Sequence, residues 1–96
     1  MTPPKRIYVL VGRPSPLWRW QTASLTRTTP EYWFVTPIGA VRSAIATSQA
    51  VGCVFDPIGW LVVAADFEDH DIDGVARFRF NWGETFEPFW LLRGPR

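Results

Sequence analysis

The sequence predicts one small α+β domain built on a mostly antiparallel sheet. The chain has 96 residues, 47% of them hydrophobic, so it is long enough to form one core and too apolar to be disordered. Seven glycines and nine prolines divide it into short apolar segments, and a single segment has helical periodicity. We therefore expect one domain over residues 1–96, in the order β-β-β-α-β-β-β. Its sheet should have five to six strands, with the helix packed on one face.

Three strands are expected before the helix. Residues 6–11 form an apolar run that ends at Gly12, residues 18–25 follow as a looser strand, and residues 32–35 are short and aromatic. The first run is too short to span a membrane and lacks the small-residue exit of a signal peptide. We therefore expect a cytoplasmic protein with no membrane partner.

One helix is expected to begin after Thr36. The threonine hydroxyl suits a helix N-cap, and Pro37 suits the first helical position. Val41 and Ile45 recur at helical spacing, and Gly52 is a plausible stop. The apolar stripe is narrow and rich in alanine, which favours close packing on a sheet.

The second half of the chain begins with a strand over residues 60–65, which is apolar on both faces and therefore central. An acidic loop is expected over residues 66–74. Residues 75–82 then alternate, which makes this segment the clearest strand of the sequence. Its two expected faces are Phe78, Phe80 and Trp82 against Arg77, Arg79 and Asn81.

A turn at Gly83 and Glu84 should lead into a last strand over residues 85–92. Pro88 inside this strand predicts a sheet edge or a bulge, because proline cannot donate to a ladder. Such an edge would allow homodimerisation, with Pro88 as a partial safeguard against further pairing.

The residues that carry catalysis are sparse, so we expect no enzyme and no cofactor. His70 is the only histidine and lies among acids, as a solvated loop residue would. Cys53 lies in an apolar segment typical of an inert, buried thiol, and a single cysteine fits a reducing compartment. Glu84 and Glu87 could form a carboxylate pair, but a domain this small offers little room for a substrate cleft.

Asp69, Asp71 and Asp73, followed by Gly74, resemble the first half of an EF-hand calcium loop. The closing glutamate of that pattern would fall at Phe80, and the flanks read as strands rather than helices. An Asp-Gly hairpin turn explains the same residues equally well. Calcium binding is thus left open, and no metal site is assigned.

Charge is distributed unevenly along the chain. Residues 1–48 hold six basic side chains and one acidic one, whereas residues 49–96 hold four basic and eight acidic ones. The expected loop over residues 66–74 concentrates acids, and an acidic prong of this kind could dock on a basic surface that normally holds nucleic acid. Its candidate partner-binding residues are Glu68, Asp69, Asp71 and Asp73.

Aromatic residues exceed what one small core hides, because six Trp, seven Phe and two Tyr occur in 96 residues. Trp, Tyr and Arg dominate protein–protein hot spots. The further candidate partner-binding residues are Trp18, Arg19, Trp20, Arg77 and Arg79.

The favoured hypothesis is therefore a non-enzymatic module, an inhibitor or adaptor, that occupies a surface of a larger protein, for example a nucleic-acid-handling complex. By size and by the lack of a catalytic set, it is comparable with inhibitors of phages and mobile elements such as anti-CRISPR proteins, although no motif supports this analogy. The alternative is a single-stranded nucleic-acid-binding domain that uses arginine and aromatic side chains. The net charge of +1 is low for that function.

Overall fold

The computed structural model describes residues 2–13 and 24–93. The regular elements of these residues are β1 (Arg6–Gly12), β2 (Leu25–Thr28), a 3₁₀ turn (Pro30–Tyr32), α1 (Pro37–Ala50), a second 3₁₀ turn (Pro57–Gly59), β3 (Trp60–His70), β4 (Ala76–Phe86) and α2 (Pro88–Arg93). Neither described α-helix has the length and apolar character needed to cross a membrane.

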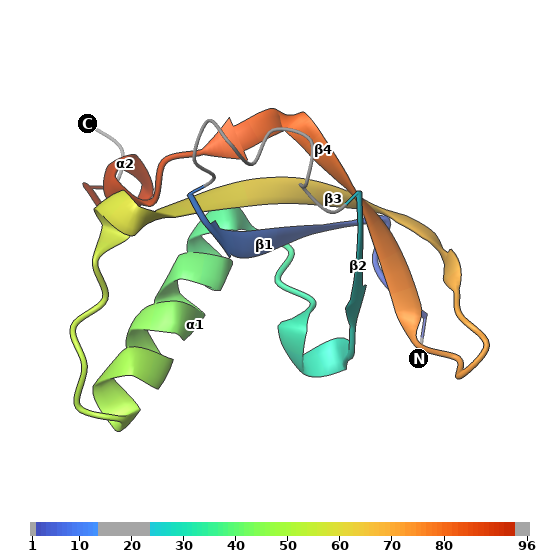
Figure 1. The fold of residues 1–96 in the computed structure, drawn as a ribbon, viewed down its shortest axis with the longest axis horizontal. Coiled ribbons are helices and arrows are strands. Elements are labelled where there is room, and N and C mark those ends of the chain that lie inside the picture. Colours follow the sequence, from blue (N-terminus) through green and yellow to red (C-terminus); the bar gives the residue numbers. More distant parts are fainter. Residues whose placement is uncertain (1, 14–23, 94–96) are drawn as a thin grey trace.

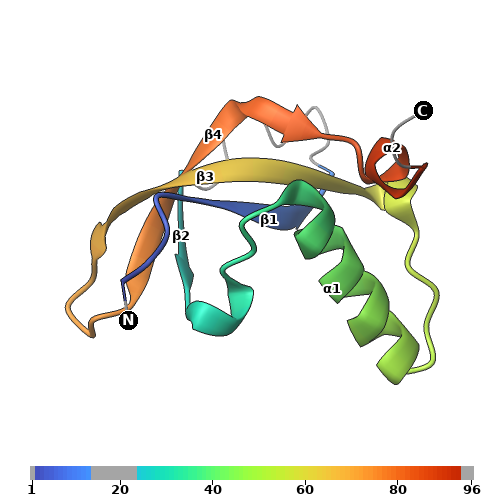
Figure 2. The same cartoon turned by 180° about the vertical axis from the view of Figure 1, so that it is seen from behind.

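The four strands form one antiparallel sheet in the order β1-β3-β4-β2. The sheet curls into a half-barrel, and α1 lies below β1 and β3, while α2 lies at the same end of the molecule (Figure 1, Figure 2). The α+β class and the antiparallel sheet are thus confirmed. The described residues contain four strands, against the five to six expected for the chain, and the strand expected over residues 18–25 lies mostly outside the described residues.

The core lies against the middle of the sheet. Ile7, Ala65, Ala76 and Phe78 form one buried cluster, and Trp33 packs on it with its ring 6.4 Å from that of Phe78. Strand β3 runs between β1 and β4 and is buried from 62 to 65, so the prediction of a central strand is confirmed.

Helix α1 begins and ends where its capping residues predicted. The Thr36 hydroxyl accepts a hydrogen bond from the Gly39 amide at 3.1 Å, and Pro37 occupies the first turn. The helix ends at Ala50, and Gly52 has a φ of 76°, a left-handed conformation that favours glycine.

The strand expected over residues 32–35 was wrong. Pro30 begins a 3₁₀ turn that includes Tyr32, and the following residues reach α1 without forming a strand. A main-chain bond joins this segment to the sheet, from the Tyr8 amide to the Phe34 carbonyl at 2.8 Å. The physical reason is that Pro30, with its fixed φ and missing N–H, suits the first turn of a 3₁₀ helix and cannot donate to a strand ladder.

The acidic loop expected over residues 66–74 was also wrong in its extent. Strand β3 continues to His70, so the loop is limited to residues 71–75. Phe67 makes this extension favourable, because its ring packs 5.7 Å from that of Phe78 in the core. The carboxylates beside it are matched by arginines, as described below.

The turn at Gly83 and Glu84, and the last strand over residues 85–92, were wrong as well. Strand β4 continues to Phe86, and the pairing with β3 jumps from Asn81 to Thr85, so residues 82–84 bulge out of the ladder. Pro88 then begins α2, since its fixed φ and missing N–H suit a first helical turn. The edge proposed for homodimerisation therefore does not exist as a strand.

Candidate interaction surfaces

The predicted acidic residues do not form a free prong, because arginines face them across the sheet. Arg77 and Arg79 share one face of β4, and their partners, Asp69 and Glu68, are consecutive on β3. Consecutive strand residues normally point to opposite faces. The register shifts between Phe67 and Asp69, so Glu68 is the extra residue of a β-bulge. The bulge turns both carboxylates toward the same two arginines.

Two of these ion pairs are bidentate. Arg77 donates from Nε and Nη2 to the two carboxylate oxygens of Asp69 at 2.6 and 2.7 Å. Arg79 donates in the same way to Glu68 at 2.9 and 2.7 Å. The hydrogen bond from each guanidinium lowers the pKa of its carboxyl partner and raises the pKa of the arginine.

Arg6 extends this pattern to the neighbouring strand β1. Its guanidinium donates to both oxygens of Asp66, at 2.7 and 3.2 Å, and to Glu84 at 2.5 Å. The bond to Asp66 is the largest cause of a raised pKa for Arg6. The bulge of β4 is what brings Glu84 within reach, although the sequence placed it in a turn.

The loop between β3 and β4 is organised by one aspartate. Asp71 Oδ1 accepts hydrogen bonds from the amides of Asp73 and Val75, both at 2.9 Å, and its Oδ2 accepts from Arg27. Backbone bonding, the bond to Val75 first, lowers the pKa of Asp71. Gly74 has a φ of 78° in this turn, which explains the Asp-Gly pair. The Asp71 side chain therefore shapes the loop.

We call this set of groups the ion-pair ladder; it comprises Arg6, Arg27, Arg77 and Arg79 with Asp66, Glu68, Asp69, Asp71, Asp73 and Glu84. Four arginines thus meet six carboxylates, so most of the predicted negative charge is compensated locally. Within residues 2–13 and 24–93, no cluster of three or more acidic, histidine or cysteine side chains is placed to hold a metal ion.

Three further predicted residues are not placed. Trp18, Arg19 and Trp20 lie outside the described residues.

The two candidate catalytic side chains are not brought together into a site. His70 is exposed, as expected, but it ends β3 instead of lying in a loop, and its ring packs 5.2 Å from that of Phe67. The buried setting expected for Cys53 was wrong, because this thiol is exposed after the end of α1. The chain there turns away from the sheet, so its apolar side chains have no core to enter.

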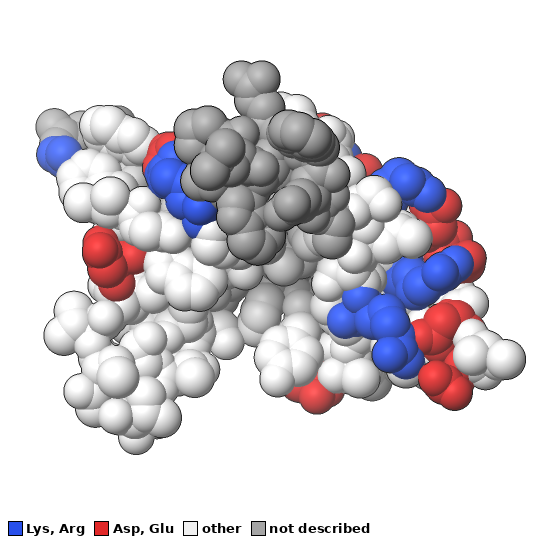
Figure 3. All heavy atoms as spheres, in the orientation of Figure 1, with Lys and Arg blue, Asp and Glu red and all other residues white. Residues whose placement is uncertain are grey.

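The opposite end of the molecule exposes large hydrophobic side chains. Helix α2 contacts both α1 and the 3₁₀ turn Pro57–Gly59, which brings these segments together. In Figure 3 this end is mostly uncharged, whereas basic and acidic groups gather at the other end. We call it the apolar end and define it by Ile58, Phe89, Trp90 and Leu92, each exposed by at least 42%.

Helix α2 carries the aromatic centre of this end. Phe89 and Trp90 pack edge to face at 5.3 Å, and the Arg93 guanidinium lies 5.5 Å from both ring centroids. Trp90 nevertheless remains 62% exposed. The sequence assigned Phe89 and Trp90 to the last strand, over residues 85–92. Pro88, read as a helix start, was the signal that could have identified α2.

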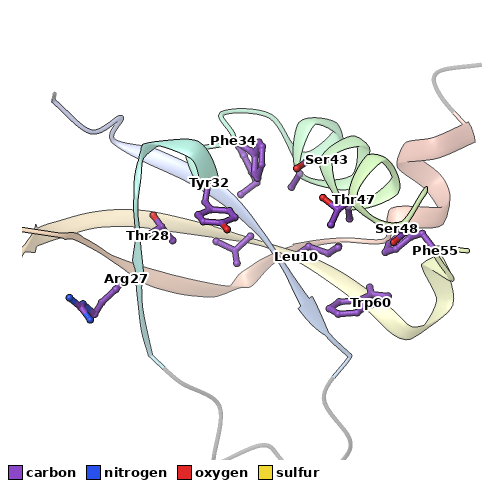
Figure 4. Close-up of a pocket in the computed structure, with 14 residues that line it drawn as sticks. Leu10, Arg27, Thr28, Tyr32, Phe34, Ser43, Thr47, Ser48, Phe55 and Trp60 are labelled. Atoms are coloured by element: carbon purple, nitrogen blue, oxygen red, sulfur yellow. The ribbon is translucent and has the colours of Figure 1, made fainter. Parts of the chain in front are cut away.

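A cleft of about 480 Å³ lies between α1 and the edge of the sheet (Figure 4). Strand β1 contributes its floor around Leu10, and Tyr32 lies on the side opposite α1. Trp60 closes the end nearest to the apolar end, with Phe55 at a ring distance of 6.2 Å. No local sequence pattern predicted this cleft, because the cleft depends on the angle at which α1 leaves the sheet.

Comparisons with known proteins assign no relative to this chain: no family model matches it, and no curated protein or solved structure matches it.

Proposed function

We propose that this chain is a non-enzymatic protein-binding module that occupies a surface of a larger protein partner, as an inhibitor or an adaptor does. The observation that carries the proposal is the apolar end, where Phe89, Trp90 and Leu92 are exposed on one short helix. Exposed large hydrophobic side chains that cluster on one element are typical of interaction sites.

Trp90 is the residue that best fits the centre of such an interface. Tryptophan and arginine are enriched among hot spots, and Arg93 already lies over the Trp90 ring. Ile58 lies on the 3₁₀ turn that contacts α2, so it extends the same surface. We therefore assign most of the affinity to the apolar end.

The ion-pair ladder supports a secondary role in steering. Its excess of carboxylates over arginines leaves a modest negative potential, which favours approach to a basic partner surface, such as that of a complex that handles nucleic acid. Glu68, Asp69, Asp71 and Asp73 remain proposed rim contacts together with Arg77 and Arg79. Trp18, Arg19 and Trp20 stay predictions, and we place the module in the cytoplasm.

Single-stranded nucleic-acid binding is the weaker alternative on this geometry. It needs arginines that are free to meet phosphates. The guanidiniums of Arg77 and Arg79 are each held by two hydrogen bonds to a carboxylate. We therefore treat nucleic-acid binding as an outcome of the test below.

The test compares Trp90→Ala with Ile72→Ala in pull-downs of the tagged chain from source-cell lysate, with and without nuclease. Ile72 is the matched control, since it is a fully exposed hydrophobic residue in the β3–β4 loop at the far end. We expect a nuclease-resistant partner that Ile72→Ala retains and Trp90→Ala loses. Direct titration should show affinity weakened at least thirtyfold, as for a hot spot of about 2 kcal/mol.

Equal retention of the partner by both variants would remove the apolar end from the proposal. Recovery of nucleic acid that disappears on nuclease treatment or with added salt would replace the proposal by the nucleic-acid alternative. Circular dichroism of both variants checks that each one is folded.

A further inference from the structure

The cleft beside α1 has the dimensions of a small-molecule site. Its volume of about 480 Å³ lies within the range of roughly 300–1,000 Å³ that is typical of ligand pockets. Its walls come from α1, from β1 and from the segment that contains Tyr32 and Phe34. Three independent segments thus define its shape.

Aromatic rings line this cleft without filling it. Tyr32 is 58% exposed although it projects into the centre of the view in Figure 4, and Phe34 lies above it. Trp60 lies at the other end and is also exposed. Rings arranged around an open space offer faces on which a planar ligand can stack.

Hydroxyl groups lie between these rings. Ser43, Thr47 and Ser48 line the side formed by α1, and each hydroxyl can both donate and accept a hydrogen bond. Thr28 also lines the cleft, from β2. A purely aliphatic ligand would leave such groups unsatisfied, so a ligand with its own polar atoms fits better.

The described lining of the cleft offers no free charge to an ion. Among residues 2–13 and 24–93, Arg27 is the one charged residue that lines it, and its guanidinium is bound to Asp71 and Asp73. A phosphate or carboxylate on the ligand would have to compete with both aspartates. The chemistry of the cleft therefore favours an uncharged ligand.

From this combination of rings, hydroxyls and paired charge, we propose that the cleft binds an uncharged, planar heteroaromatic small molecule. Its rings stack on Tyr32 and Trp60, and its ring nitrogens or carbonyl groups bond to hydroxyls of α1. This site is separate from the helix α2 surface to which partner binding is assigned, so either one can exist without the other.

Three variants test the site, one by filling the cleft and two by removing a contact with the ligand. Ala44→Phe places a ring into the cleft from α1, so it should abolish ligand binding while leaving the thermal midpoint equal or higher. Tyr32→Ala removes a stacking face and should weaken binding about tenfold. Thr47→Val removes a hydroxyl at constant shape and should weaken binding about fivefold.

The measurement is a titration followed by two-dimensional amide NMR. Indole and adenine are the uncharged probes, and indole-3-acetate carries the indole ring with an added negative charge. We expect saturable shifts confined to residues of the cleft, weaker binding of indole-3-acetate than of indole, and unchanged binding in Trp90→Ala.

The proposal is overturned if neither indole nor adenine saturates at millimolar concentration. Binding that survives Ala44→Phe in full would place the ligand elsewhere and would also overturn it. Tighter binding of indole-3-acetate than of indole would show that a cation, and not the uncharged lining, selects the ligand.

Discussion

The two ends of this molecule differ in whether their side chains find partners within the chain. At the end formed by β3 and β4, six carboxylates lie against four arginines, so charge is matched within the chain. At the apolar end, Trp90 and Ile58 are exposed with nothing from the described chain to cover them. Figure 3 shows the charged groups gathered at the first of these ends. A conspicuous cluster in a sequence can thus be satisfied in the fold, while an inconspicuous segment supplies the unmatched surface.

The largest expected effect is on the free energy of unfolding, and it should differ between the buried core next to the charged end and the exposed helix α2 at the apolar end. Phe78 is fully buried and contacts Phe67 and Trp33. Phe78→Ala should lower the free energy of unfolding by about 3–5 kcal/mol, because it leaves a cavity as well as losing buried area. Trp90→Ala should change it by less than about 1 kcal/mol, since most of that side chain is already in water.

Urea denaturation of both variants, followed by circular dichroism, provides the measurement. The m-value should remain similar if each variant unfolds in two states. A loss of stability in Trp90→Ala as large as that in Phe78→Ala would mean that α2 belongs to the core, and the contrast between the ends would fail.

The next effect concerns the loop at the charged end. Asp71→Ala removes the acceptor of two backbone amides and of Arg27, so it should lower the thermal midpoint clearly. Asp73→Ala should change the midpoint much less, because that carboxylate is 73% exposed and has a single contact of 3.5 Å to Arg27. Differential scanning calorimetry compares the two. Equal midpoints would show that the loop does not depend on Asp71.

This difference also decides how the steering role is tested. An Asp71→Lys substitution would disturb the loop as well as the charge, so a loss of partner binding could not be assigned to charge alone. Asp73→Lys is the cleaner substitution, since its side chain holds no backbone group in place among the described contacts.

The parts of the fold that the sequence predicted are those governed by neighbouring residues. Thr36, Pro37 and Gly52 bound α1 because capping and turn chemistry act within a few positions. The alternation of Arg77 and Phe78 likewise identified β4, since strand periodicity is local.

The candidate surfaces were harder to predict, because they depend on contacts between distant residues. Arg6 and Asp66 are 60 positions apart, so their pairing follows from the register of β1 on β3. The bulge at Glu68 has no local signal that fixes which face its carboxylate takes. Pro88 fitted either a strand edge or a helix start, and contacts of α2 with α1 favour the helix.

A smaller effect is expected from pH. The pKa values of Glu68, Asp69 and Asp71 lie below their ordinary values of 4.5 for glutamate and 3.8 for aspartate in the folded chain. The unfolded chain therefore binds more protons in acid, and stability is lost as pH falls. The thermal midpoint should be level from neutral pH to about pH 5 and should fall below that, through the ordinary values and down to the lowered ones.

The triple substitution Glu68→Gln, Asp69→Asn and Asp71→Asn is the control for that profile. It should reduce the acid-induced fall in the midpoint, because fewer carboxylates then change protonation on unfolding. If the thermal midpoint of the triple variant fell in acid as much as that of the unchanged chain, the pH dependence would come from other groups.

The smallest expected effect is the coupling within a single ion pair of the ladder. Arg79 and Glu68 are 52% and 35% exposed, so water and salt screen their attraction despite the bidentate geometry. A double-mutant cycle with Arg79→Gln and Glu68→Gln should give a weak favourable coupling. This coupling should decrease between 0.05 and ~1 M NaCl, because the screening length falls from more than ~10 Å to about 3 Å. A parallel cycle between Arg79 and Asp56, whose side chain caps the 3₁₀ turn at the apolar end, should be additive. If the first coupling were large and insensitive to salt, the ladder would be holding the sheet together, and the charged end would owe its order to charge rather than to the core around Phe78.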